Sequence, residues 1–93
     1  MIIGIVKAPI FIPGSSSLKE KRMVLRSLKS KLRKNFNISI IELADHDKWQ
    51  KSTLALAAIG KEKASLNSMI SNVINYLEGN GQIQLLDYEM EMI

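Results

Sequence analysis

The sequence predicts a small α+β domain in which two helices pack on one face of a four-stranded antiparallel sheet. Four stretches rich in branched apolar residues alternate with two stretches of helical periodicity, in the order β-α-β-β-α-β. The 93 residues are the size of one domain, so we expect a single unit over residues 1–93. With 46% hydrophobic residues and no cysteine, the chain can form a core but no disulfide.

The first strand is predicted over residues 2–12, which are rich in Ile and Val. Its even positions form one apolar face, which would point toward the core. The opposite face of the sheet is left without a helix in this architecture. It is also apolar, because it would carry Ile3, Ile5, Phe11, Ala55, Ala57 and Ile59. Exposed apolar patches are typical of interfaces, so we expect a homodimer or a partner on this face. The alternative is that curvature and long neighbouring side chains cover it.

The first helix is predicted over about residues 18–35. Ser17 and Glu20 match a capping box at its start. At 100° per residue, its apolar side chains fall within one arc of about 120°. They are Leu18, Val24, Leu25, Leu28, Leu32 and Phe36. Lys21 falls within the same arc, and the sequence leaves open whether this lysine is buried or extends to water.

The remaining elements complete the order. Residues 38–43 and 53–59 are expected to form the second and third strands, separated by a polar loop. Apolar residues at helical spacing predict a second helix over about 62–78, which the Gly-Asn-Gly of residues 79–81 ends. Residues 83–92 are expected to form the fourth strand. This is the order of the ferredoxin-like fold.

The basic residues are concentrated in the first helix. Residues 19–34 hold eight of the thirteen basic residues and one acid, a local balance of +7. The rest of the chain has five basic and eight acidic residues, a balance of −3. Five basic side chains lie in one line of about 80° beside the apolar arc, and Lys31 and Lys34 lie apart from it. We call these five the basic stripe: Lys19, Arg22, Arg26, Lys29 and Arg33.

The basic stripe predicts an acidic partner. Same-sign neighbours on a helix repel, so a helix that faces only water usually mixes both signs. Arginine suits bidentate contacts to phosphate. We therefore expect RNA or a ribosomal subunit as the partner, with about four phosphate contacts and a log affinity that falls against log salt with a slope of about −3. Two alternatives stay open. One is a solvated helix flank, either unpaired or paired with the acidic fourth strand of this or another subunit. The other is a protein-interaction module that uses the open apolar face without nucleic acid.

The loop before the first helix is a second candidate site. Ser15, Ser16 and Ser17 could hold an anion, because free amides, hydroxyls and the helix dipole would converge there. The loop lacks the Gly-Lys-Ser end of a Walker loop. An ordinary N-cap is the alternative, and it is the more common use of such a sequence.

Glu42, Asp45, His46 and Asp47 lie near one another in the sequence and could ligate a metal or another ligand. One histidine without a second at helical spacing is more typical of a turn. No nucleophile or second base has a place beside His46. We therefore predict no metal site, no cofactor and no catalytic residue, and a protein that is not an enzyme.

Trp49, just before the third strand, is predicted to pack as a lid over the sheet edge. Stacking on a nucleic-acid base is the alternative, which the absence of a second aromatic around it disfavours. Residues 52–59 of the third strand contain no aromatic side chain. This excludes the common mode in which a sheet of this fold stacks single-stranded RNA on aromatics of its central strands.

The sequence also indicates a location. Residues 1–7 lack the charged start and cleavage site of a signal peptide, and no apolar run approaches the ~20 residues that cross a bilayer. The absence of cysteine favours a reducing compartment. We expect a cytoplasmic protein without a membrane partner.

Residues 13–22 (Pro-Gly-Ser-Ser-Ser-Leu-Lys-Glu-Lys-Arg) and 45–51 (Asp-His-Asp-Lys-Trp-Gln-Lys) resemble the YlxP-like family of small bacterial proteins, a family of unknown function. The resemblance runs the whole length of the chain. It departs at Lys48, where the family often has another apolar residue. It implies a ferredoxin-like fold and genes that often lie among those for translation initiation and ribosome maturation, which favours RNA or the ribosome as partner. The family has no established catalytic residues to carry over.

Overall fold

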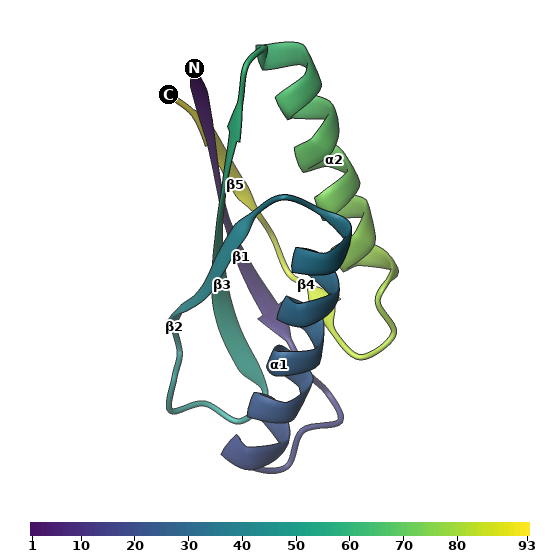
Figure 1. Cartoon of the computed structure of the whole chain (residues 1–93). Helices are drawn as coiled ribbons and strands as arrows, with labels where there is room; N and C mark the ends of the chain where they lie inside the picture. The colour runs from purple at the N-terminus through teal and green to yellow at the C-terminus, as the bar shows by residue number, and fades with distance from the viewer.

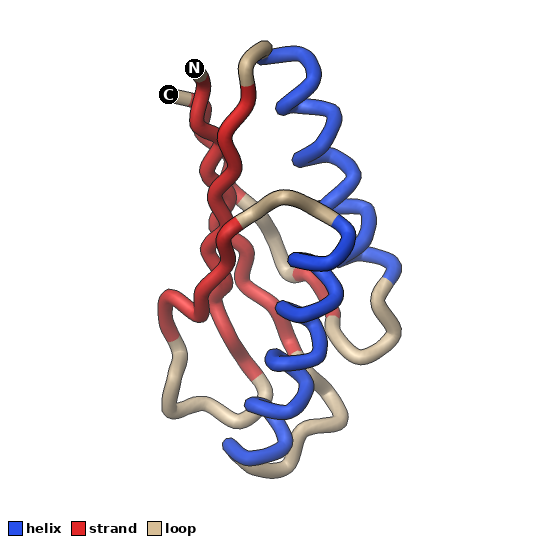
Figure 2. Tube along the Cα trace, in the orientation of Figure 1, coloured by secondary structure: helices blue, strands red, loops and turns tan.

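The computed structural model describes all 93 residues as two layers, a sheet and a pair of helices on one face of it (Figure 1). The molecule is elongated, with extents of 42 × 21 × 18 Å. The two termini lie beside each other at one end of the sheet, where Ile3 and Ile93 exchange backbone hydrogen bonds of 2.7 and 2.9 Å (Figure 2). The opposite face of the sheet carries no element of the chain.

The predicted order of elements is confirmed. The elements are β1 (Ile2–Phe11), α1 (Leu18–Asn35), β2 (Ser39–Ala44), β3 (Lys51–Gly60), α2 (Lys63–Gly79), β4 (Gln84–Leu85) and β5 (Glu89–Met92). The strands are antiparallel in the order β2-β3-β1-β4, and β5 also pairs with β1. This is the ferredoxin-like arrangement, with β2 at one edge and β4 and β5 at the other.

The prediction of a single fourth strand over residues 83–92 is wrong in one respect, because the strand is broken between β4 and β5. The break lies opposite Pro9 of β1. The Leu86 N–H donates to the Pro9 carbonyl at 3.0 Å. In an antiparallel pair the return bond would come from residue 9, but proline has no N–H. The ladder therefore cannot continue there, and one extra residue is accommodated before pairing resumes between Lys7 and Glu89.

The core lies between the sheet and the two helices. The even positions of β1 from Val6 onward are buried, as the alternation predicts. The helices contribute their predicted apolar faces, including Leu25, Leu28 and Leu32 of α1. The helix α2 approaches the sheet closely at Gly60, where an added Cβ would lie 2.9 Å from the Leu66 Cβ. This close contact fixes α2 over β1 and β3. Neither helix is long and apolar enough to span a membrane.

Candidate nucleic-acid interface

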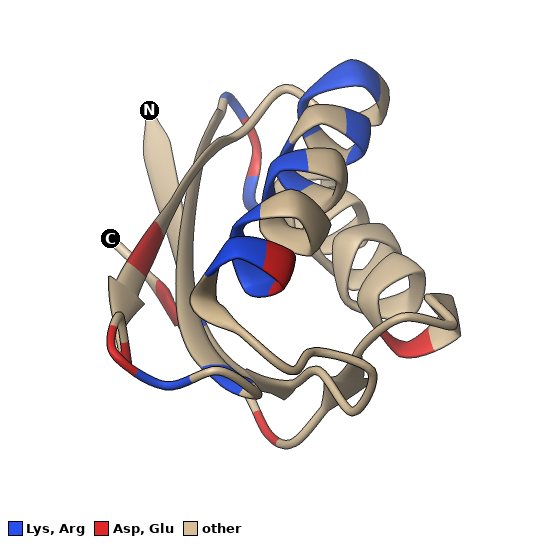
Figure 3. Ribbon diagram, turned by 90° about the horizontal axis from the view of Figure 1, so that it is seen from below, with Lys and Arg blue, Asp and Glu red and all other residues tan.

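The basic stripe lies along the flank of α1 that is nearer to β2. Figure 3 shows the Lys and Arg positions following α1 turn after turn, whereas α2 carries almost none. Arg33 fixes the orientation of this flank, because its guanidinium donates to the Ile40 carbonyl of β2 at 3.1 Å. Since β2 is an edge strand, nothing in the chain covers the stripe from that side.

The five stripe side chains differ in their exposure and in their hydrogen bonds within the chain. Lys19, Arg22 and Arg26 are exposed. Lys29 is half-buried, and Arg33 is exposed but tied to β2 through one of its donors. Four side chains are therefore free of any hydrogen bond within the chain, and all five ammonium or guanidinium groups keep donors that could meet phosphate oxygens.

None of the five stripe cations forms an ion pair. The chain has two ion pairs, Lys21 with Glu42 and Lys48 with Asp45. The acids of the fourth strand, Glu89 and Glu91, belong to β5 at the opposite edge of the sheet from β2. The stripe is therefore not neutralised by the acidic strand of the same molecule, so that half of the alternative is wrong, and pairing with the strand of another subunit stays a prediction.

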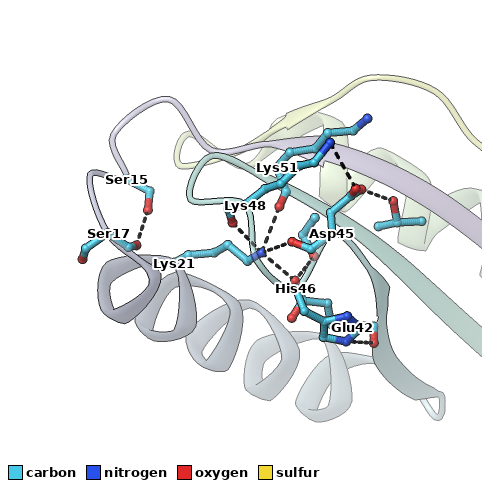
Figure 4. A network of polar contacts seen from close by, with 10 residues as sticks. Ser15, Ser17, Lys21, Glu42, Asp45, His46, Lys48 and Lys51 are labelled. Atoms are coloured by element: carbon cyan, nitrogen blue, oxygen red, sulfur yellow. Dashed lines mark hydrogen bonds and ion pairs between the residues drawn. The ribbon is translucent and has the colours of Figure 1, made fainter.

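Lys21 is buried, with 1% of its surface exposed, which answers the question that the sequence left open. Its side chain leaves α1 and ends among the carbonyls of the loop between β2 and β3 (Figure 4). The Nζ donates to the carbonyls of Asp45, Lys48 and Lys51 at 2.7, 2.7 and 2.9 Å. It also lies 2.9 Å from the Glu42 Oε2. The charge is thus fully partnered, as a buried ammonium must be.

Glu42 completes this arrangement from β2. Its carboxylate accepts a hydrogen bond from the Ser52 hydroxyl at 2.7 Å in addition to the contact with Lys21. Partial burial alone would raise the pKa of Glu42, but the hydrogen bonds from Lys21 and Ser52 outweigh it and lower the pKa. We call Lys21, Glu42 and the carbonyls of Asp45, Lys48 and Lys51 the lysine cage. It joins α1, β2 and the loop at one point.

Asp45 shapes the start of the loop. Its φ is 67°, the left-handed region that aspartate tolerates better than most residues. Its carboxylate accepts from the Thr53 hydroxyl at 2.8 Å and lies 3.7 Å from the Lys48 Nζ. The Thr53 hydrogen bond is the main reason why the pKa of Asp45 is lowered. Asp45 is therefore engaged in holding the loop.

The loop does not assemble a metal site. The His46 Nε2 lies 3.2 Å from the Glu42 backbone carbonyl. Asp47 is exposed and has no partner within the chain. No three His, Asp or Glu side chains lie close enough together to ligate one metal ion.

The three serines before α1 are occupied by the chain itself. The Ser17 hydroxyl accepts from the Glu20 N–H at 3.1 Å, which confirms the N-cap. Glu20 reaches back one residue further than the capping box predicts, and accepts from the Ser16 hydroxyl at 2.7 Å and from the Ser16 N–H. The hydroxyl bond is the larger reason for the lowered pKa of Glu20. The Ser15 hydroxyl donates to the Ser17 carbonyl at 3.0 Å. Because the Glu20 carboxylate takes the Ser16 donors, this geometry favours the N-cap over an anion site.

Trp49 does not pack as a lid, contrary to the prediction. Trp49 lies in the loop between β2 and β3, and 57% of its surface is exposed. The sheet face away from the helices also stays open, contrary to the alternative that curvature and long side chains cover it. Ile41, Leu43 and Ile59 are 56%, 44% and 67% exposed, whereas Ile3 and Ile5 are only partly buried.

The sequence identified the stripe but not the lysine cage. The only signal for the cage was a lysine within the apolar arc of α1. Its backbone acceptors lie 24, 27 and 30 residues further along the chain, beyond the reach of local patterns. Backbone carbonyls carry no residue signature, so this part of the arrangement required the fold.

The fold and the stripe define a small α+β protein with a cationic helix flank and an open sheet face. Residues 3–90 match the model of a family described as "Protein of unknown function (DUF503)", and the chain belongs to this family. It is also similar to the "Uncharacterized protein YlxP" of Bacillus subtilis (strain 168). The two are 28% identical over 83 residues, which cover 89% of this chain and 90% of that protein. The resemblance found in the sequence is thereby confirmed.

Proposed function

We propose that this protein is a non-catalytic cytoplasmic factor that binds RNA, free or within a ribosomal subunit, through the phosphate backbone. The observation that carries the proposal is the basic stripe on α1, five cations in one line of which none is neutralised by the chain. Such a line repels itself unless an acidic partner lies along it. Phosphates spaced along a nucleic-acid strand provide that complement.

The structure adds two supports. The burial of Lys21 removes one cation from the surface of α1, so the exposed charge is concentrated on the stripe side and at Lys31 and Lys34. The Arg33 contact to β2 holds the helix flank in a fixed position. A fixed row of cations loses less conformational freedom on binding than mobile side chains on a loop.

The test is a filter-binding titration of ribosomal RNA with matched charge variants. The triple variant Arg22→Glu, Arg26→Glu and Arg33→Glu reverses three stripe residues. The control reverses three exposed lysines outside it: Lys31→Glu, Lys34→Glu and Lys63→Glu. Both variants change the net charge by the same amount. We expect the stripe variant to lose at least about tenfold in affinity and the control to lose much less.

Equal losses in the two variants would mean that net charge, and not the stripe, governs binding. Circular dichroism and thermal unfolding of both variants show whether α1 stays folded. If wild-type protein binds no RNA at low salt, the proposal is wrong.

A second function is favoured by a separate observation, the open sheet face. Its most exposed apolar side chains are Ile41 and Ile59, at 56% and 67%. We propose that this face holds two copies of the chain together as a homodimer, with the helices on the outside. The stripes of the two copies would then both face solvent, so dimerisation and RNA binding are compatible.

Analytical ultracentrifugation tests the dimer. Wild-type protein is expected to sediment as a dimer, and the double variant Ile41→Glu and Ile59→Glu as a folded monomer, because both side chains are already exposed. The matched control is Ser71→Glu and Asn72→Glu, which adds two acids on the exposed surface of α2. A wild-type protein that is monomeric at high concentration contradicts this second function.

A further inference from the structure

Trp49 is the most exposed aromatic side chain of the chain. It is the sole tryptophan of the chain, and 57% of its surface is exposed. An indole ring that stays in water does not gain the large favourable free energy of burying its apolar surface. Tryptophans are enriched among the residues that dominate binding at interfaces. Trp49 also contributes nothing to the core cluster between sheet and helices.

The backbone around Trp49 is held firmly on both sides. The carbonyl of the preceding residue, Lys48, accepts from the Lys21 Nζ at 2.7 Å. The carbonyl of the following residue, Gln50, accepts from the Ile12 N–H at 2.7 Å. The Lys51 carbonyl is bound to the Lys21 Nζ at 2.9 Å. The exposed ring is therefore presented from a fixed loop, which lowers the entropy lost when it binds something.

The lysine cage also places this loop beside the stripe. Lys21 immediately precedes Arg22 in α1, and one lysine side chain spans the distance from the helix to the loop. In Figure 1 the loop between β2 and β3 and the start of α1 lie at the same end of the molecule. Trp49 and the N-terminal part of the stripe therefore share one end.

The charges of the loop fit a nucleotide. The Lys48 side chain is exposed over 56% of its surface, and its partner Asp45 already accepts from Thr53. Asp47 is the one exposed acid beside them without a partner. An aromatic ring with cations nearby stacks a base while a cation meets its phosphate. A base is available for this only where it is unpaired.

The geometry points to Trp49 as the site that stacks one unpaired base of the RNA whose backbone crosses the basic stripe. This inference rests on the proposed RNA binding and names the kind of RNA: a stem with a bulged or unpaired nucleotide. It differs from recognition on the sheet, because β3 carries no aromatic side chain on which further bases could stack. The protein would thus distinguish an RNA stem with one unpaired base from a fully paired stem.

The test compares two hairpin RNAs, one perfectly paired and one with a single bulged adenine, bound to wild type, Trp49→Ala and Trp49→Phe. Wild type is expected to bind the bulged hairpin about tenfold more tightly. Trp49→Ala should lose this preference and keep its affinity for the paired stem. Trp49→Phe should keep most of the preference for the bulged hairpin. Because Trp49 is the sole tryptophan, its fluorescence should be quenched by the bulged hairpin only.

The outcomes separate the inference from the proposed function. If wild type binds both hairpins equally and Trp49→Ala changes neither, the inference fails while RNA binding through the stripe stands. If wild type binds neither hairpin at low salt, RNA binding itself fails. If Trp49→Ala instead shifts the dimer to monomer without affecting RNA, the ring belongs to a protein interface and the inference is overturned.

Discussion

Lys21 is the residue on which the arrangement of the interface depends most. A buried ammonium is stable only when every donor is satisfied, and Lys21 reaches three carbonyls and one carboxylate. Its position in the apolar arc of α1 is thus not an interruption of the core but the link from α1 to the loop that carries Trp49. The sequence predicted the apolar arc and placed this lysine within it. The acceptors of its hydrogen bonds belong to residues that only the fold brings close to Lys21.

The substitution Lys21→Met measures this link at the residue scale. The methionine fills a similar volume but leaves Glu42 and three carbonyls without their donor. We expect a loss of roughly 3 kcal/mol in the free energy of unfolding, the low end for a broken buried pair, because Glu42 keeps 17% exposure. Urea unfolding of both proteins measures this difference in the free energy of unfolding. The matched control, Lys31→Met on the exposed side of α1, should stay within about 0.5 kcal/mol of wild type. A Lys21→Met protein as stable as this control would contradict the role of the cage.

At the scale of elements, the cage joins α1 to β2 through a titratable group. The pKa of Glu42 is lowered by its hydrogen bonds from Lys21 and Ser52, despite partial burial. A carboxyl with a lowered pKa in the folded state stabilises that state above its ordinary pKa of 4.5. The stabilisation is lost as the pH falls from there through the lower pKa of the folded protein.

The substitution Glu42→Gln isolates this contribution. The variant should be less stable than wild type at neutral pH, and the difference should shrink as the pH falls below 4.5. Thermal unfolding at a series of pH values measures the two curves. Glu20 and Asp45 also have lowered pKa values, but they are present in both proteins and cancel in the difference. A difference that stays constant with pH would show that the Glu42 charge does not hold the junction.

Element by element, the hydrophobic periodicity predicted both helices to within one residue or so and the order of all strands. It did not predict the break between β4 and β5, because that break depends on which residue of β1 lies opposite. The register places Pro9 there, and a proline on the bonding side of a strand ends the ladder. Strand register is a property of the fold and not of either strand alone.

At the scale of the whole molecule, the basic stripe and the acids of β5 lie far from each other. The cations lie on the flank of α1 toward one edge of the sheet, and the acids of β5 lie at the opposite edge. The apolar sheet face lies on the far side from the helices. Glu89 and Glu91 of β5 pair with Lys7 and Ile5 of β1, so they share the open sheet face with the apolar side chains. The stripe lies on the helix side of the molecule, so the proposed dimer would leave the stripe free for RNA. The stripe residues were predicted from the sequence, because helical periodicity is local and fixes which side chains share a flank.

The salt dependence of RNA binding tests the central claim most directly. In the filter-binding titration of wild-type protein, the logarithm of the affinity should fall against the logarithm of salt concentration with a slope of about −3, as expected for about four phosphate contacts. The variant with Arg22, Arg26 and Arg33 reversed should show a much shallower slope, and the control with Lys31, Lys34 and Lys63 reversed should keep nearly the wild-type slope. A wild-type affinity that does not change with salt, or a slope that the stripe variant shares with wild type, would contradict binding of RNA through the basic stripe.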